Sequence, residues 1–192
     1  MRRRDFLALA AALPAASAAA DTVAPPKIPS TLQAMEFELV DDRGAPARPQ
    51  DLIGRPALVF FGFTFCPEIC PTTLSRIGAW FEEIGPAADV IQTVLITVDP
   101  ERDTVAAMAE YVSAFDPAPR GWTGTPAEIA RAADAFGVVY RKVPLDGGEY
   151  TMDHTAGVFL FSADGAFAGI IDFHEAPELS ISKLRKRLIT PL

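Results

Sequence analysis

Two apolar runs, separated by a segment of helical periodicity, constrain the fold of this chain more than any other feature. Residues 57–61 read ALVFF and a second run extends from Val90 to Val98, so both are predicted to be strands buried on both faces. Between them, apolar residues recur at helical spacing after Pro71 until Gly85-Pro86 ends the pattern. Because a helix joining two fully buried strands is typical of a parallel β-α-β unit, the sequence predicts an α/β protein.

The rest of the chain extends this unit. Further helices are predicted between Val105 and Phe115, from the capping box Thr125-Pro126-Ala127-Glu128 to Gly137, and from Pro177 onward. Further strands are predicted near Met35, at 138–143, at 156–161 and at 167–173, the last two joined by an Asp164-Gly165 turn. The expected fold is a thioredoxin-like α/β sandwich, with a central mixed sheet and flanking helices.

Residues 1–20 have the features of an export signal. Three arginines precede an apolar stretch, and small residues in an A-x-A arrangement follow it. The segment Arg3-Arg4-Asp5-Phe6-Leu7 is similar to a twin-arginine signal. An uncleaved membrane anchor is the alternative, but Pro14 and the weakly apolar, Ala-rich centre of the segment favour cleavage. We therefore expect a mature protein in the oxidising periplasm of a bacterium.

The remaining sequence divides into a linker and one domain. Residues 21–34 contain Pro25, Pro26 and Pro29 and are predicted to be a semi-rigid linker, and residues 35–192 are predicted to form the domain. The net charge of −8, with no basic tract outside the ends of the chain, argues against a nucleic-acid partner. Nothing in the sequence requires a dimer, and we expect a monomer.

Two cysteines lie where the first buried strand leads into the following helix, in the segment Cys66-Pro67-Glu68-Ile69-Cys70-Pro71. In open α/β sheets, ligands bind beyond the carboxyl ends of the strands, which is where this segment is expected. Pro71 fits the first helical position, and Cys70 would then be the cap residue. Both sulfurs are expected near a helix N-terminus, where the dipole and free N–H groups favour the thiolate.

The spacing of the two cysteines leaves two roles open. Thioredoxin-like oxidoreductases have two residues between their cysteines, and this chain has three. The wider loop accommodates two thiolates around one soft ion such as Cu(I). A disulfide is also compatible with this spacing. The motif is ambiguous when it is read alone.

His154 is the third candidate ligand. It lies in a polar segment just before the strand predicted at 156–161, where a thioredoxin-like fold brings its loop against the cysteine turn. Two thiolates and an imidazole form a trigonal site for Cu(I), and an added water or carboxylate also suits Cu(II). Asp153 is a candidate for orienting the imidazole or neighbouring amides. An isolated histidine usually has no such role, but polar flanks before a buried strand favour one here.

Other segments keep a functional and a structural interpretation. Residues 99–103 (DPERD) follow a parallel strand and should reach the same edge as Cys66. They are interpreted either as support for the site or a partner surface, or as a loop whose Asp caps the next helix. Glu68 is expected to face solvent. The four phenylalanines Phe60, Phe61, Phe63 and Phe65 are expected in the core.

Three segments resemble the SCO/SenC copper proteins: residues 61–72 (FGFTFCPEICPT), 98–104 (VDPERDT) and 153–157 (DHTAG). The resemblance extends from Met35 to Leu188 and implies a thioredoxin-like fold with copper bound by Cys66, Cys70 and His154. It implies delivery of copper to the dinuclear copper centre in subunit II of cytochrome c oxidase, with an upstream periplasmic copper donor as a second partner. Family members have also been assigned a reductase role on the cysteines of that centre.

The expected function is therefore a periplasmic copper metallochaperone, which is a binding protein and not an enzyme. The alternative is a thiol-disulfide oxidoreductase with Cys66 and Cys70 as its redox pair. A peroxiredoxin-like peroxidase is disfavoured, since Phe63 takes the place of the Thr or Ser that such enzymes have three residues before the attacking cysteine. Met152 stands where the family more usually has a small aliphatic residue, so we consider both a weak thioether contact to copper and a change in packing. Many relatives keep a transmembrane anchor, whereas this leader has the features of a cleavable one.

Overall fold

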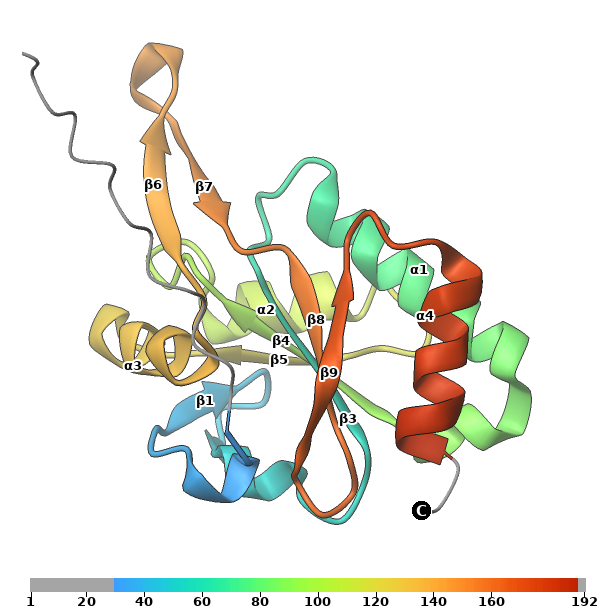
Figure 1. The fold of residues 1–192 in the computed structure, drawn as a ribbon. Helices are drawn as coiled ribbons and strands as arrows, with labels where there is room; N and C mark the ends of the chain where they lie inside the picture. Colours follow the sequence, from blue (N-terminus) through green and yellow to red (C-terminus); the bar gives the residue numbers. More distant parts are fainter. Residues whose placement is uncertain (1–29, 190–192) are drawn as a thin grey trace, which may run out of the picture.

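The computed structural model describes residues 30–189, so the predicted export signal and most of the predicted linker lie outside the described residues. A mixed sheet of seven strands has the order β2-β1-β5-β4-β3-β8-β9 (Figure 1). Its strands are β1 (Leu39–Asp41), β2 (Pro46–Ala47), β3 (Ala57–Gly62), β4 (Gln92–Thr97), β5 (Arg120–Thr123), β8 (Gly157–Phe161) and β9 (Phe167–Asp172). Strands β3, β4 and β5 run parallel, and β8 and β9 extend the sheet in antiparallel register. The predicted mixed α/β sheet is confirmed.

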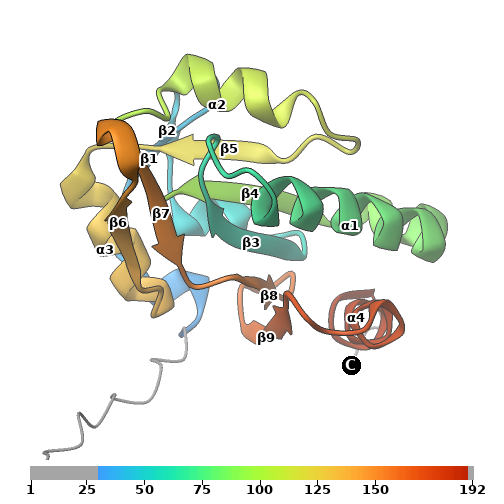
Figure 2. The same ribbon diagram turned by 90° about the horizontal axis from the view of Figure 1, so that it is seen from above.

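Four α-helices in the described chain cover this sheet: α1 (Ile69–Ile84), α2 (Val105–Val112), α3 (Pro126–Phe136) and α4 (Pro177–Leu184). Seen from above, α3 lies on one side of the sheet, and α1 and α4 lie together on the other (Figure 2). None of these helices is long and apolar enough to cross a membrane.

A separate hairpin, β6 (Tyr140–Pro144) with β7 (Tyr150–His154), projects beyond the edge of the sheet (Figure 1). The two strands are antiparallel, and Tyr140 lies opposite His154. His154 was predicted in a polar loop before the strand at 156–161. Its segment does precede β8, but it pairs with β6 and is therefore a strand and not a loop.

An aromatic cluster fills the space between α3 and the sheet. Phe136, at the end of α3, has four aromatic neighbours with ring centroids 5.2–6.1 Å away, namely Phe37, Phe61, Phe159 and Phe161. On the opposite face of β3, Phe60 contributes to the layer that packs under α1. Phe60, Phe61 and Phe63 are buried as predicted, but the side chain of Phe65 is 62% exposed, which corrects its placement in the core.

Candidate metal centre

The cysteine turn begins where β3 ends at Gly62. A loop of residues 63–68 carries Cys66, and α1 begins at Ile69 after the cap residue Glu68. Cys70 therefore lies inside the first helical turn, and its predicted role as the cap is wrong. The reason is that the first turn of a helix tolerates proline at any position, since N–H groups there have no intrahelical partner, so Pro71 did not mark the first residue.

Gly62 makes room for the sulfur of Cys70. A methyl group at this position would lie 2.8 Å from Cys70 Sγ and 3.1 Å from a methyl carbon of Leu95. The Cys70 side chain is consequently fully buried under the end of β3, whereas Cys66 is half-buried and Glu68 is exposed, as predicted. The two sulfurs thus occupy very different environments.

Hydrogen bonds shift the pKa values of the two cysteines in opposite directions. The Cys70 side chain, together with the amides of Cys70, Glu68 and Ile69, lowers the pKa of Cys66 to about 5 despite partial burial. The Cys70 amide donates to Cys66 Sγ over 3.3 Å. The same interaction with Cys66, reinforced by burial, raises the pKa of Cys70 far above its ordinary value. At neutral pH the pair is a Cys66 thiolate beside a Cys70 thiol.

His154 approaches this pair from the end of β7. Its Nε2 lies 3.9 Å from Cys70 Sγ, and its ring packs edge-on against Phe63. Nδ1 lies 3.0 Å from the carbonyl oxygen of Thr155, and a proton on Nδ1 donates to that oxygen. The Nε2 lone pair is then free to act as a ligand. Asp153, the predicted orienting group, instead forms an exposed ion pair with Arg141.

A cavity of about 220 Å³ lies between the cysteine loop and β7. Cys66 and His154 line it, and so does Met152, which is two residues before His154 on the same face of the strand. The cavity gives the Cys66 thiolate and the imidazole a shared space that opens at the molecular surface.

The donor types fit a soft metal ion, although the site is not closed. Within residues 30–189, no three or more His, Cys, Asp or Glu side chains are already arranged as a metal site. Two sulfurs and an imidazole nevertheless match the preference of Cu(I) for soft ligands and imidazole. Closing such a site would require Cys70 to lose its proton and the hairpin to bring His154 toward both sulfurs.

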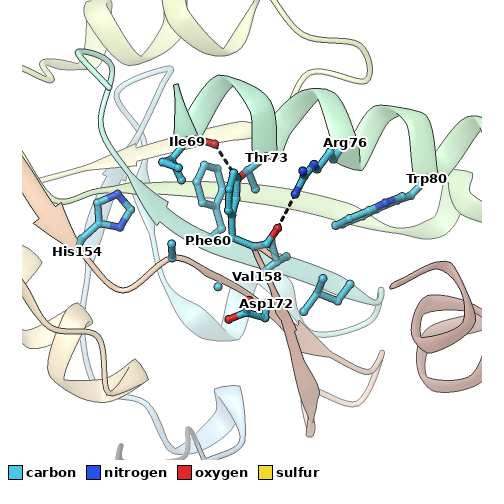
Figure 3. A pocket seen from close by; sticks show the side chains of 12 residues that line it. Phe60, Ile69, Thr73, Arg76, Trp80, His154, Val158 and Asp172 are labelled. Carbon is cyan, nitrogen blue, oxygen red and sulfur yellow. Dashed lines mark hydrogen bonds between the residues drawn. The ribbon is translucent and has the colours of Figure 1, made fainter. Parts of the chain in front are cut away.

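The other side of His154 faces an apolar crevice between α1 and the β8–β9 hairpin (Figure 3). Its volume of about 10 Å³ is enough for one water molecule. Arg76 closes it by lying 4.7 Å from the centroid of the Phe173 ring and donating to the Phe173 carbonyl (Figure 3). The side chains that line the crevice therefore pack beside His154, and the space is too small to be a second ligand site.

Asp103 fixes the start of the cysteine loop. Its buried carboxylate accepts hydrogen bonds from the Thr64 amide at 3.0 Å and the Thr64 hydroxyl at 2.6 Å, and a third from Thr97 at the end of β4. Burial raises the pKa of Asp103. The cap of α2 is Thr104, whose hydroxyl accepts from the Ala107 amide, so the interpretation of the DPERD segment as an Asp cap is wrong. The segment supports the site.

Beside the site, Tyr150 was missed as a functional candidate, whereas Arg102 lies in the DPERD segment, for which a functional interpretation was kept. Arg102 and Tyr150 connect the DPERD segment with β7, through a stacked guanidinium and a hydrogen bond to the Tyr150 carbonyl. A signal was present for Arg102, because its segment follows a parallel strand. Tyr150 had none, since nothing in the sequence alone revealed that its segment pairs into a hairpin.

Comparison with known proteins relates the whole domain to one family. Residues 26–189 match the family model described as SCO1/SenC. The chain is 36% identical over 156 residues to the mitochondrial SCO2 homologue of Mus musculus, which covers 80% of this chain and 61% of that protein. It is 35% identical over 152 residues to an SCO2-like protein of Rickettsia conorii, with 78% and 74% covered. The match spans about three fifths of the length of the mammalian relatives.

Solved structures of related proteins also resemble this chain in both sequence and fold. The structure of Bradyrhizobium japonicum ScoI with copper bound is 40% identical, with a TM-score of 0.72 over 84% of this chain and 100% of that one. The crystal structure of yeast Sco1 with copper bound is 27% identical, with a TM-score of 0.74 over 87% and 91%. The solution structure of apo Sco1 from Thermus thermophilus is 34% identical, with a TM-score of 0.72 over 84% and 92%.

Proposed function

The chain belongs to the SCO1/SenC family, and we propose that it binds copper through Cys66, Cys70 and His154 and delivers it to the dinuclear copper centre in subunit II of cytochrome c oxidase. The observation that carries this proposal is that Cys66 and His154 line one cavity while the sulfur of the buried Cys70 lies within 3.9 Å of the His154 ring nitrogen. A thiolate at Cys66, a thiol at Cys70 and the Nε2 of His154 at 3.9 Å from that thiol come from a loop, a helix and a strand. The related structures of Bradyrhizobium japonicum ScoI and yeast Sco1 have copper bound.

The chemistry of capture follows from the difference between the cysteines. Cys66 offers a thiolate at the rim of the cavity, so it is the group that meets an incoming Cu(I) ion first. The charge of the bound ion then replaces the proton on Cys70, and copper binding releases that proton. The imidazole of His154 completes a trigonal set through its Nε2.

Release of copper to a partner depends on the same difference in exposure between the ligands. Cys66 and His154 lie at the surface-facing cavity, whereas Cys70 is buried. An incoming thiolate of the partner can therefore replace one exposed ligand while Cys70 still holds the ion. Ligand exchange in steps avoids a free ion at any stage.

We infer that the protein works in a bacterial periplasm and receives copper there from an upstream donor. Support for this location comes from the twin-arginine-like pattern of residues 1–20.

The alternative function, a thiol-disulfide oxidoreductase, is favoured by one specific observation. A low-pKa, accessible Cys66 followed by a buried Cys70 is the arrangement of an attacking thiolate and a resolving thiol. In that reaction the Cys66 thiolate attacks a disulfide of the partner, forming a mixed disulfide while the partner's second sulfur leaves as a thiolate. Cys70 then gives up its proton and attacks Cys66 Sγ, which forms a Cys66–Cys70 disulfide and releases the partner's first sulfur as a thiolate. This reaction does not use His154.

The test is the Cu(I) affinity of the reduced protein, measured without oxygen by competition with a chromogenic chelator. Cys66→Ser, Cys70→Ser and His154→Ala are each expected to weaken binding of one copper equivalent by roughly a hundredfold or more. His174→Ala is the matched control, because it removes the other, exposed histidine of the chain. Affinity indifferent to His154, together with rapid disulfide exchange, would assign the protein to the oxidoreductases instead. Delivery is tested by mixing the copper-loaded protein with the apo soluble domain of subunit II and following the absorbance of its dinuclear centre.

A further inference from the structure

Arg102 lies between the two segments that carry the candidate ligands. Its guanidinium carbon is 4.6 Å from the ring centroid of Phe65, the residue immediately before Cys66. The same carbon is 3.8 Å from the ring centroid of Tyr150, the first residue of β7, which ends at His154. It also donates to the Tyr150 carbonyl over 3.1 Å. One side chain thus contacts both the cysteine loop and the histidine strand.

Asp99 binds both Arg102 and Tyr150 and fixes their positions relative to each other. The carboxylate of Asp99 is buried and accepts a hydrogen bond from Arg102 Nε and another, of 2.9 Å, from the Tyr150 hydroxyl. We call Phe65, Asp99, Arg102 and Tyr150 the arginine bridge. Because Asp99 is anchored in the chain directly after β4, the bridge ties β7 to the rigid central sheet.

The hairpin has few other means of holding its position. In the described chain, β6 and β7 pair with each other and not with the seven-stranded sheet. Three of the five residues of β6 are exposed. A two-stranded hairpin is marginally stable without such support. Besides the buried side chain of Met152 and an exposed ion pair between Lys142 of β6 and Glu101, the contacts of the arginine bridge anchor the hairpin on the domain.

Contacts with two aromatic rings position the guanidinium of Arg102, in addition to its hydrogen bonds to Asp99 and to the Tyr150 carbonyl. One of its nitrogens, Nη2, is buried without a hydrogen-bond partner in the described residues. The guanidinium carbon lies over the rings of both Phe65 and Tyr150. A lysine ammonium is not planar, so lysine would keep the charge and lose the stacking.

We propose that Arg102 is a positioning residue for copper: it holds the β6–β7 hairpin against the cysteine loop so that His154 remains within reach of Cys70. This inference rests on the proposed copper-binding function. Arg102 itself does not touch the metal. It acts by limiting the distance over which His154 must move when the site closes.

The first experiment compares Arg102→Met with Arg141→Met in the Cu(I) competition assay. Arg141 is the matched control, since it is a cation on the same hairpin whose exposed ion pair with Asp153 adjoins His154. We expect Arg102→Met to weaken copper binding about tenfold and Arg141→Met to leave it within about twofold. Arg102→Lys is expected to recover little of the loss. Equal affinities of the Arg102→Met and Arg141→Met proteins would overturn the inference.

A second experiment separates positioning from a general loss of structure. In a His154→Ala background, Arg102→Met should weaken copper binding no further, because the group it positions is gone. An unchanged tenfold effect in that background overturns the inference. If His154→Ala alone leaves affinity unchanged, the proposed copper site fails, and that result is distinguishable from a failure of Arg102 alone.

The thiolate-to-copper absorption of the Cu(II) form gives a readout that a merely structural role would not change. The bands of Arg102→Met should shift toward those of His154→Ala, while those of Arg141→Met stay at the wild-type position. Should Arg102→Met fail to fold, Tyr150→Phe takes its place, since it removes only the hydrogen bond to Asp99. Tyr150→Phe must then weaken copper binding more than Arg141→Met does, and equal affinities reject the proposal.

Discussion

At the scale of single residues, the two cysteines have been given opposite chemistry by the backbone around them. Three amides of the turn and the Cys70 thiol donate to Cys66, while Cys70 lies buried beneath the end of β3. A thiolate stabilised in this way needs no nearby arginine or lysine. The asymmetry suits capture of a cation at the surface followed by transfer to a protected ligand.

The pH dependence of alkylation tests this asymmetry. The rate at Cys66 in the reduced apo protein should rise with a midpoint near pH 5 and be level at neutral pH, because its pKa is about 5. Cys70 should remain unreactive at the same pH. Since the folded pKa lies below the unfolded value of about 8.5, this thiol stabilises the fold above that value and the contribution is lost as pH falls toward 5. Iodoacetamide labelling with mass spectrometry measures both rates.

Cys70→Ala provides the control for this measurement. It removes the side-chain donor that contributes most to the low pKa of Cys66, so the midpoint should move upward. A wild-type midpoint near that of a free thiol would contradict the proposed role of the turn.

Gly62→Ala tests how closely the strand end fits the buried sulfur. The added methyl group would lie 2.8 Å from Cys70 Sγ, so the sulfur must shift and copper affinity should fall about tenfold, with about 1–3 kcal/mol of lost stability from overpacking. Gly121→Ala is the matched control, because its methyl group would crowd Met108 and Val112 without contacting a sulfur. Denaturant unfolding and the Cu(I) competition assay check the two effects. Equal copper affinities for the two variants would show that the position of Cys70 is not limited by Gly62.

At the scale of helices and strands, the sequence predicted well those elements whose ends or burial depend only on residues nearby in the chain. The capping box at Thr125 and the left-handed Gly137 bound α3 as predicted, because both ends depend on side chains within a few residues. Strands β3 and β4 followed from apolar runs that only a doubly covered strand explains. The short strand β5 was missed, since four residues carry too little pattern and its place between β4 and β1 is set by tertiary pairing.

The candidate site was predictable to the extent that its motif is local. Cys66 and Cys70 share one turn, and His154 could be placed near them only by assuming the topology of the fold. Its hairpin, and the contact of Arg102 with Tyr150 across 48 residues of sequence, depend on how distant segments meet. Phe65 was placed in the core because aromatic residues usually are, whereas here it covers the guanidinium of Arg102 at the surface.

At the scale of the whole molecule, the core and the candidate site occupy separate regions. The aromatic cluster around Phe136 fills one face of the sheet, and the cysteine turn with β7 lies beyond the carboxyl end of β3 (Figure 1). Phe61 and Phe63 connect the two regions, since the first packs on Phe136 and the second on His154. The central sheet and its aromatic cluster can therefore supply most of the free energy of unfolding. The cysteine turn and β7, which form the rim of the molecule at the site, remain free to close around a ligand.

Phe136→Ala tests this separation. Loss of a buried ring that contacts four others should reduce the free energy of unfolding by about 3–5 kcal/mol, since both apolar contact and a cavity are involved. Copper that binds only the folded state adds stability according to its concentration and dissociation constant. If core and rim are independent, copper must add the same increment to Phe136→Ala and to the wild type, as measured by denaturant unfolding with and without Cu(I). A smaller increment in the variant would mean that α3 also helps to hold β7 in place, and the coupling energy would be the difference between the two increments.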